Sequence, residues 1–162
     1  RAGLRIDRMI EGIDVMKGCF AEGAFSYAGK HYTITNYNGS PKPVQAPCPP
    51  ILIGGGGKRV LTYAAQVADI IGINATMSAG AVGPEAISTM TAEAVDEKVD
   101  IVRDAVGSRI NHVEMNIRAF MVNITDDAAG AISRLAKGIG VEEKMVADTP
   151  FALMGPPSAM DD

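Results

Sequence analysis

The chain has 162 residues, of which 47% are hydrophobic and 21% are charged, a composition typical of one soluble globular domain. Its formal net charge is −4 with no block of like charges, which argues against nucleic acid or an anionic membrane as a partner. No apolar run approaches the length of about 20 residues that crosses a bilayer, and no signal peptide is recognisable, so a cytoplasmic location is expected.

The two ends and the cysteines narrow the class of protein further. The chain starts at Arg1 inside a helical pattern and stops soon after a turn-like Gly-Pro-Pro at residues 155–157, and we interpret both ends as truncations. Cys19 and Cys48 have neither a metal-binding nor a disulfide spacing. Because the chain also has only two histidines, to which we assign no role, no metal site is expected.

The first fifty residues predict a helix, a hairpin and an extended segment. Apolar residues recur every three or four positions over residues 5–20, which indicates an amphipathic helix. Residues 25–34 are rich in aromatic and β-branched side chains around a glycine turn, as in a small β-hairpin. Five prolines in residues 41–50 predict a stiff, extended segment.

The rest of the chain alternates between strands and helices. Strands are predicted at residues 51–53, 69–74 and 113–124, helices at 58–67, 85–106, 142–147 and after a cap at 125–127, and a Gly/Ala/Ser loop at 75–84. This order predicts an α/β fold with a parallel sheet and right-handed crossovers. A complete (β/α)8 barrel needs about 250 residues, so the alternatives are a small open α/β domain or part of a barrel.

The most informative local feature is the run of four glycines, Gly54–Gly57, between a buried strand and a helix. Glycine adopts backbone angles closed to other residues and lets a ligand approach closely. The N–H groups that begin the helix attract anions, and Lys58 and Arg59 add positive charge. We interpret the run as a phosphate cradle, although Leu52 and Arg59 break the P-loop and dinucleotide patterns. The alternative is a tight turn without a ligand.

Polar residues follow the next two strands. Asn74 and Thr76 come after the second strand, at the carboxyl edge of the sheet where ligands gather, although an ordinary turn would have the same sequence. Glu114, Asn116 and Arg118 alternate along the third strand and share one face. That face would be a buried polar cluster if it points into a barrel, and unremarkable if it faces solvent.

Several segments together resemble the luciferase-like oxidoreductase superfamily, and within it the class that uses coenzyme F420. The most specific is the block from Pro41 through Gly57 to Asp69, with its Pro-rich approach, apolar strand and glycine run. Three others fit the family: Arg8, Glu11 and Ile13 in the first helix; Phe25, Gly29, Lys30 and Tyr32 in the hairpin; and residues 149–155.

The resemblance implies that residues 1–162 are one partial (β/α)8 TIM-barrel domain with a small hairpin insertion, lacking the first strands and the last one. It implies that Gly55, Gly56, Gly57, Asn74 and Thr76 bind the phosphate of F420 or, alternatively, FMN. The implied reaction is hydride transfer or monooxygenation on a small organic substrate, by an enzyme for which a homo-oligomer is one option.

Because the family's ring-binding strands are absent, we expect part of a phosphate site but no complete active site, assign no catalytic residue, and predict no activity of the chain alone. Turnover with reduced F420 or FMN would contradict this. Two other hypotheses remain open at this point. One is a non-catalytic phosphate- or nucleotide-binding α/β module, and the other is a structural half-barrel that completes itself by association.

Overall fold

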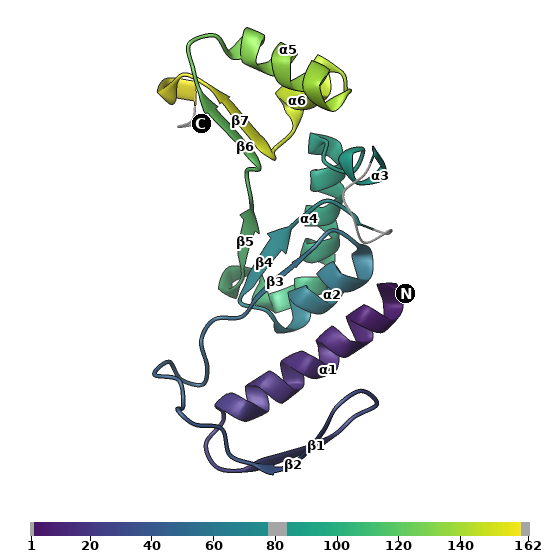
Figure 1. The fold of residues 1–162 in the computed structure, drawn as a ribbon. Helices are drawn as coiled ribbons and strands as arrows, with labels where there is room; N and C mark the ends of the chain where they lie inside the picture. The colour runs from purple at the N-terminus through teal and green to yellow at the C-terminus, as the bar shows by residue number, and fades with distance from the viewer. Residues whose placement is uncertain (1, 78–83, 160–162) are drawn as a thin grey trace. The chain divides into compact units, whose positions relative to one another are not determined.

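The computed structural model describes residues 2–77 and 84–159 and divides into two compact units, Arg1–Ile51 and Leu52–Asp162. Figure 1 follows the chain from helix α1 in purple to strand β7 in yellow. Of the predicted loop at 75–84, positions 78–83 lie outside the described residues, as do residues 160–162 at the C-terminal end. In neither described range does a helix have the length and apolarity that a bilayer span requires.

The first unit consists of a helix and a hairpin, as predicted. Helix α1 (Ala2–Phe20) begins a little before the predicted position 5, and strands β1 (Phe25–Ala28) and β2 (Thr33–Tyr37) pair antiparallel. The carboxylate of Glu11 on α1 accepts hydrogen bonds of 2.8 to 3.2 Å from the backbone N–H groups of residues 30–32. One side chain of the helix therefore fixes the hairpin turn. The Pro-rich segment that follows contains no helix or strand.

The second unit begins with the predicted parallel sheet. Strands β3 (Leu52–Gly55), β4 (Ile70–Ile73) and β5 (Glu114–Ile117) lie in that order, and all pair parallel. Helices α2 (Lys58–Val67) and α4 (Ala92–Val106) pack against each other and against the sheet. Their contact forms a core in which several side chains have no exposed surface: Leu61, Ala64, Ala65, Ile71 and Val102.

These helices cover one face of the sheet only. Leu52 is 55% exposed, whereas Ile53, which points to the other face of the same strand, is 5% exposed. Gly54 pairs with Gly72, and Gly72 with Asn116, so these three share the open face with Leu52. The open face thus has little side-chain bulk at its centre.

The end of α2 is held by a distant arginine. The short 3-10 helix η1 (Gly107–His112) carries Arg109, whose guanidinium donates to the carbonyl oxygens of Ala65 and Ala68, both at 2.7 Å. The last carbonyls of a helix have no partner within it, so these two hydrogen bonds satisfy groups that would otherwise be unpaired.

The helix predicted over residues 85–106 is wrong in one respect, since it is broken into α3 (Pro84–Ile87) and α4. The hydroxyl of Thr91 accepts a hydrogen bond from the N–H of Ala94 at 3.2 Å and so caps α4. The hydroxyl of Thr89 donates to the carbonyl of Ala86 at 2.7 Å. Short hydroxyl side chains that bond to the local backbone compete with the continuous helix.

The strand predicted over residues 113–124 is also two strands, because β5 ends at Ile117 and β6 (Met121–Ile124) belongs to another sheet. The β4–β5 ladder ends at the pair Ile73 and Ile117, so later residues have no partner there. The N–H of Phe120 donates instead to the carbonyl of Phe151 at 2.8 Å. Backbone groups must be paired somewhere, and the chain changes partner at this point.

The partner of β6 is β7 (Ala152–Gly155), a parallel strand that the sequence analysis did not predict. Helix α5 (Ala128–Ile139) precedes α6 (Glu143–Asp148), and the short 3-10 helix η2 (Pro157–Ala159) follows β7. Asp127 caps α5 by accepting from the N–H of Gly130 at 2.9 Å, which confirms the predicted cap.

Candidate functional site

The run Gly54–Gly57, called the glycine bend from here on, lies at the carboxyl end of β3, where α2 begins. The residue before the helix, Gly57, has an extended backbone and no side chain that could cap the helix. The first N–H groups of a helix have no partner within it, and the helix dipole makes their surroundings positive. Gly55–Gly57 are half-buried, and Lys58 and Arg59 are exposed. The bend is therefore accessible, and its electrostatics favour an anion.

Close packing, and not unusual backbone angles, explains Gly55 and Gly56 of the bend. Among the described residues, positive φ angles at glycine occur only elsewhere in the chain, so the expectation of backbone angles closed to other residues is wrong here. A Cβ on Gly56 would lie 2.3 Å from the carbonyl oxygen of Ala75, and one on Gly55 would lie 2.5 Å from Cγ1 of Val60. Among the described residues, nothing lies within 4 Å of the position that a Cβ on Gly57 would take. In this part of the chain Gly57 therefore borders open space.

Asn74 and Thr76 follow β4 and lie against the bend. The backbone N–H of Asn74 donates to the carbonyl of Gly55 at 3.0 Å, and the hydroxyl of Thr76 donates to the carbonyl of Gly56 at 2.8 Å. The side-chain amide of Asn74 lies over Gly54, where a Cβ would be 3.0 Å from Nδ2. The structure thus brings the predicted residues together, with Thr76 bracing the bend.

A second threonine and a buried lysine support Thr76. The N–H of Thr76 donates to the hydroxyl oxygen of Thr89 at 2.8 Å, and Nζ of Lys98 donates to the carbonyl of Thr89 at 2.5 Å. Lys98 is only 5% exposed, and its desolvation lowers its pKa, although the charge of Glu97 acts in the opposite direction. A chain of hydrogen bonds therefore leads from α4 through Thr89 to the glycine bend.

Thr89 and Lys98 are not among the residues that the sequence predicts for the site. A weak signal was present, because Lys98 stands three residues after Val95 and four before Val102, in the buried stripe of α4. A lysine at such a position needs a hydrogen-bond partner. Its partner, the carbonyl of Thr89, is available only because the helix is broken just before α4.

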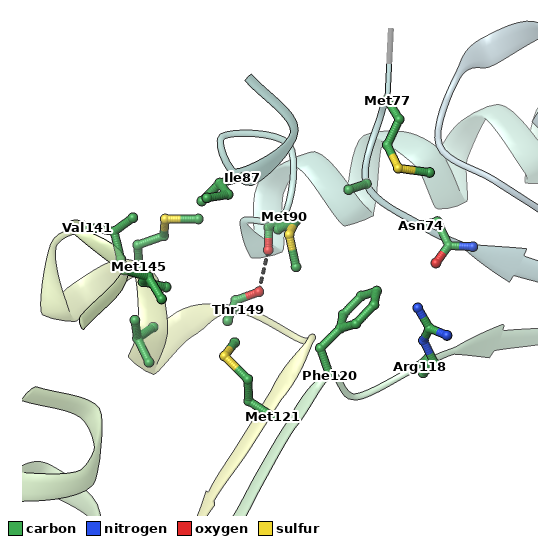
Figure 2. A pocket seen from close by; sticks show the side chains of 13 residues that line it. Asn74, Met77, Ile87, Met90, Arg118, Phe120, Met121, Val141, Met145 and Thr149 are labelled. Atoms are coloured by element: carbon green, nitrogen blue, oxygen red, sulfur yellow. Dashed lines mark hydrogen bonds between the residues drawn. The ribbon is translucent and has the colours of Figure 1, made fainter. Parts of the chain in front are cut away.

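A cavity of about 380 Å³ opens beside Asn74 within the second unit (Figure 2). Most of its lining is apolar, and it includes four methionines: Met77, Met90, Met121 and Met145. Its polar lining residues are Asn74, Arg118 and Thr149, and the hydroxyl of Thr149 is already bonded to the carbonyl of Met90. The guanidinium carbon of Arg118 lies 4.3 Å from the centre of the Phe120 ring. Figure 2 shows Arg118 pointing toward Asn74.

Glu114, Asn116 and Arg118 do not form the buried cluster that was one of the two alternatives. Glu114 and Asn116 are exposed on β5, while Arg118 lies beyond the end of that strand and lines the cavity. Arg118 stands out in the sequence as part of an alternating polar face, whereas Phe120 does not. No local pattern distinguishes Phe120 from an ordinary strand residue.

Comparison with known proteins decides the family. A sequence model described as luciferase-like monooxygenase matches residues 2–137, which is most of the chain. The chain belongs to the luciferase-like monooxygenase family. This confirms the resemblance found in the sequence, which rested on the proline-rich block, the glycine bend and the hairpin.

Sequence identity to an individual relative is low. An FMNH(2)-dependent dimethylsulfone monooxygenase of Pseudomonas putida is 26% identical over 129 residues, which are 79% of this chain and 32% of that enzyme. The chain therefore spans about a third of the length of this relative.

Two solved structures share the fold. The coenzyme F420-dependent tetrahydromethanopterin reductase of Methanopyrus kandleri superposes with a TM-score of 0.65 at 16% identity, over 94% of this chain and 51% of that one. An F420-dependent secondary alcohol dehydrogenase superposes with a TM-score of 0.66 at 14% identity, over 98% and 51%. The chain thus has part of the luciferase-like (β/α)8 fold and spans about half of these structures. The relatives include both F420-dependent and FMN-dependent enzymes.

Proposed function

We propose that this chain contributes the cofactor-phosphate site of an F420-dependent oxidoreductase, with FMN as the alternative cofactor. Gly55, Gly56 and Gly57 would hold the phosphate with their backbone N–H groups, next to Asn74 and with Thr76 as the brace of the bend. The observation that carries this proposal is the uncapped start of α2 at the carboxyl end of β3, with open space above Gly57.

When bound, the cofactor supplies hydride transfer. If the cofactor is FMN, it can instead supply the activation of oxygen for monooxygenation. The chain's own residues bind and orient it. The amides at the start of α2 neutralise the phosphate, Lys58 and Arg59 make the surrounding potential more positive, and the Thr76 hydroxyl keeps the bend in shape. The substrate in this proposal is a small organic molecule, and the enzyme is cytoplasmic.

The proposal extends to the chain's lack of activity when alone. The chain spans about half of the enzymes whose fold it shares, and the described residues at the glycine bend account for a phosphate site only. We therefore expect no turnover when the 162-residue chain is mixed with reduced F420 or reduced FMN and an electron acceptor. Measurable turnover would contradict this part of the proposal and leave the phosphate site standing.

The phosphate site is tested by titrating the ¹⁵N-labelled chain with FMN and with riboflavin, which has the same ring but no phosphate. We expect FMN, F420 and inorganic phosphate to shift the amide signals of Gly55, Gly56, Gly57 and Lys58, and riboflavin to leave them unchanged. If FMN and riboflavin act alike, the phosphate assignment is wrong. If inorganic phosphate binds as tightly as FMN and F420, the chain is a phosphate-binding module without preference for a redox cofactor.

A further inference from the structure

The cavity beside Asn74 has the properties of a binding site for an organic molecule. Its volume of about 380 Å³ lies within the range of about 300–1,000 Å³ that is usual for small-molecule sites. Four methionine side chains line it, and methionine adapts its shape to different apolar ligands. Figure 2 shows these side chains arriving from separate elements around one space.

One side of this cavity is cationic. Arg118 is the charged residue of its lining, and in the described part of the chain no carboxylate forms an ion pair with it. Its guanidinium stacks against the Phe120 ring, which restricts its position while leaving its N–H donors available. A guanidinium stays charged at every accessible pH and bonds carboxylates or related anions through two donors at once.

The cavity adjoins the proposed phosphate site through Asn74. The same side chain lies over Gly54 and lines the cavity, and its backbone N–H is bonded to the carbonyl of Gly55. A molecule in the cavity would therefore lie next to a cofactor that is held at the bend.

We propose that the cavity binds a small organic anion, with its apolar body among Met77, Met90, Met121 and Met145 and its anionic group on Arg118. The identification of this molecule as the substrate rests on the proposed function. The binding itself does not, because it depends on the cavity and Arg118 alone.

The test uses octanoate and 1-octanol, which have the same chain length but differ in charge, with the chain labelled at its methionine methyl groups. We expect octanoate to shift the signals of the four cavity methionines and to leave Met16 of α1 unchanged. Arg118→Gln should weaken octanoate binding about tenfold and leave octanol binding the same, as expected for the loss of a charge-assisted hydrogen bond. Arg118→Lys should retain part of the preference for octanoate over octanol.

Arg103→Gln is the matched control, because Arg103 is an exposed arginine on α4 that bonds to Asp100 and does not line the cavity. It should bind octanoate like the unchanged chain. Octanoate that shifts none of the four methionines, or that binds no better than octanol, would overturn the inference. Because phosphate binding is read from the glycine amides, a failure at one site is distinguishable from a failure at the other.

Discussion

Gly56 and Gly57 are neighbours in one bend, yet a methyl group added to each would have different effects. At Gly56 it would run into the backbone of Ala75, which cannot give way without moving the loop after β4. At Gly57 it would enter the space where we place the phosphate.

We predict that Gly57→Ala changes the free energy of unfolding by less than about 0.5 kcal/mol but weakens phosphate and FMN binding. Gly56→Ala should destabilise the chain by about 1–3 kcal/mol, because the added methyl overpacks the contact with Ala75. Urea unfolding and amide titration of both variants measure the two effects separately. Gly57→Ala with undiminished FMN affinity would speak against the phosphate site.

The contacts of Glu11 predict how the stability of the hairpin depends on pH. Desolvation alone would raise the pKa of its carboxyl group, but the backbone hydrogen bonds from His31, Lys30 and Tyr32, together with the charge of His31, lower the pKa from its ordinary value of 4.5. A carboxyl group whose pKa is lower in the folded state stabilises the fold above its unfolded pKa, and this contribution disappears as the pH falls through the folded pKa.

We therefore expect the thermal stability of the hairpin to decrease as the pH falls below about 4.5, and Glu11→Gln to flatten this dependence. Circular-dichroism melts between pH 6 and pH 3 measure it. Glu22→Gln, which removes another carboxylate of the same unit, is the control with which Glu11→Gln is compared. Equal slopes for the unchanged chain and Glu11→Gln would show that the carboxylate does not hold the turn.

At the scale of elements, the break between α3 and α4 is what supports the glycine bend. A continuous helix over residues 85–106 would use the carbonyl of Thr89 within the helix. In the structure this carbonyl accepts from Lys98, and the Thr89 hydroxyl accepts from the N–H of Thr76. Thr76 in turn holds Gly56. The break between α3 and α4 thereby helps to hold the glycine bend, at the end of strand β3, in position.

We predict that Thr89→Val destabilises the chain by about 1 kcal/mol, because a part-buried N–H loses its acceptor, and shifts the amide signals of the glycine bend even without ligand. Thr89→Ser should retain both the stability and the glycine amide signals of the unchanged chain. Ser88→Ala serves as control, since the Ser88 hydroxyl donates to the nearby carbonyl of Glu85. Unshifted glycine amides in Thr89→Val would remove Thr89 from the support of the bend.

At the scale of the second unit, both sheets expose apolar side chains. Val122 and Leu153 pair across β6 and β7, share one face and are 60% and 44% exposed, and Ile124 on the same face is 56% exposed. Leu52 is similarly exposed on the open face of the first sheet. Contiguous apolar surface of this kind commonly packs against another surface.

We predict that the chain self-associates with increasing concentration, and that Val122→Thr combined with Leu153→Thr shifts the equilibrium toward the monomer. Light scattering coupled to size-exclusion chromatography measures the mass. Val44→Thr is the control, because Val44 is 99% exposed but lies in the Pro-rich segment and not on a sheet. A monomeric chain at all concentrations would contradict the prediction.

Much of the fold could be predicted because its signals are local. The apolar spacing of α1, the apolar run of β3 and the Asp127 cap of α5 each depend on residues within a few positions of one another. The glycine bend and its neighbours Asn74 and Thr76 were predictable for a related reason. Parallel strands joined by a helix place their carboxyl ends at one edge, so chain order alone brings these residues together.

The sequence by itself determined the family, the parallel β3–β4–β5 sheet and the place of the glycine bend. Only the tertiary structure decided that β5 ends at Ile117, that Lys98 supports Thr89, and that Arg118 and four methionines surround one cavity. The physical reason is the range of the interactions. Periodicity and capping act between near neighbours, whereas a backbone hydrogen-bond partner such as Phe151 for Phe120 is available only after distant segments have packed.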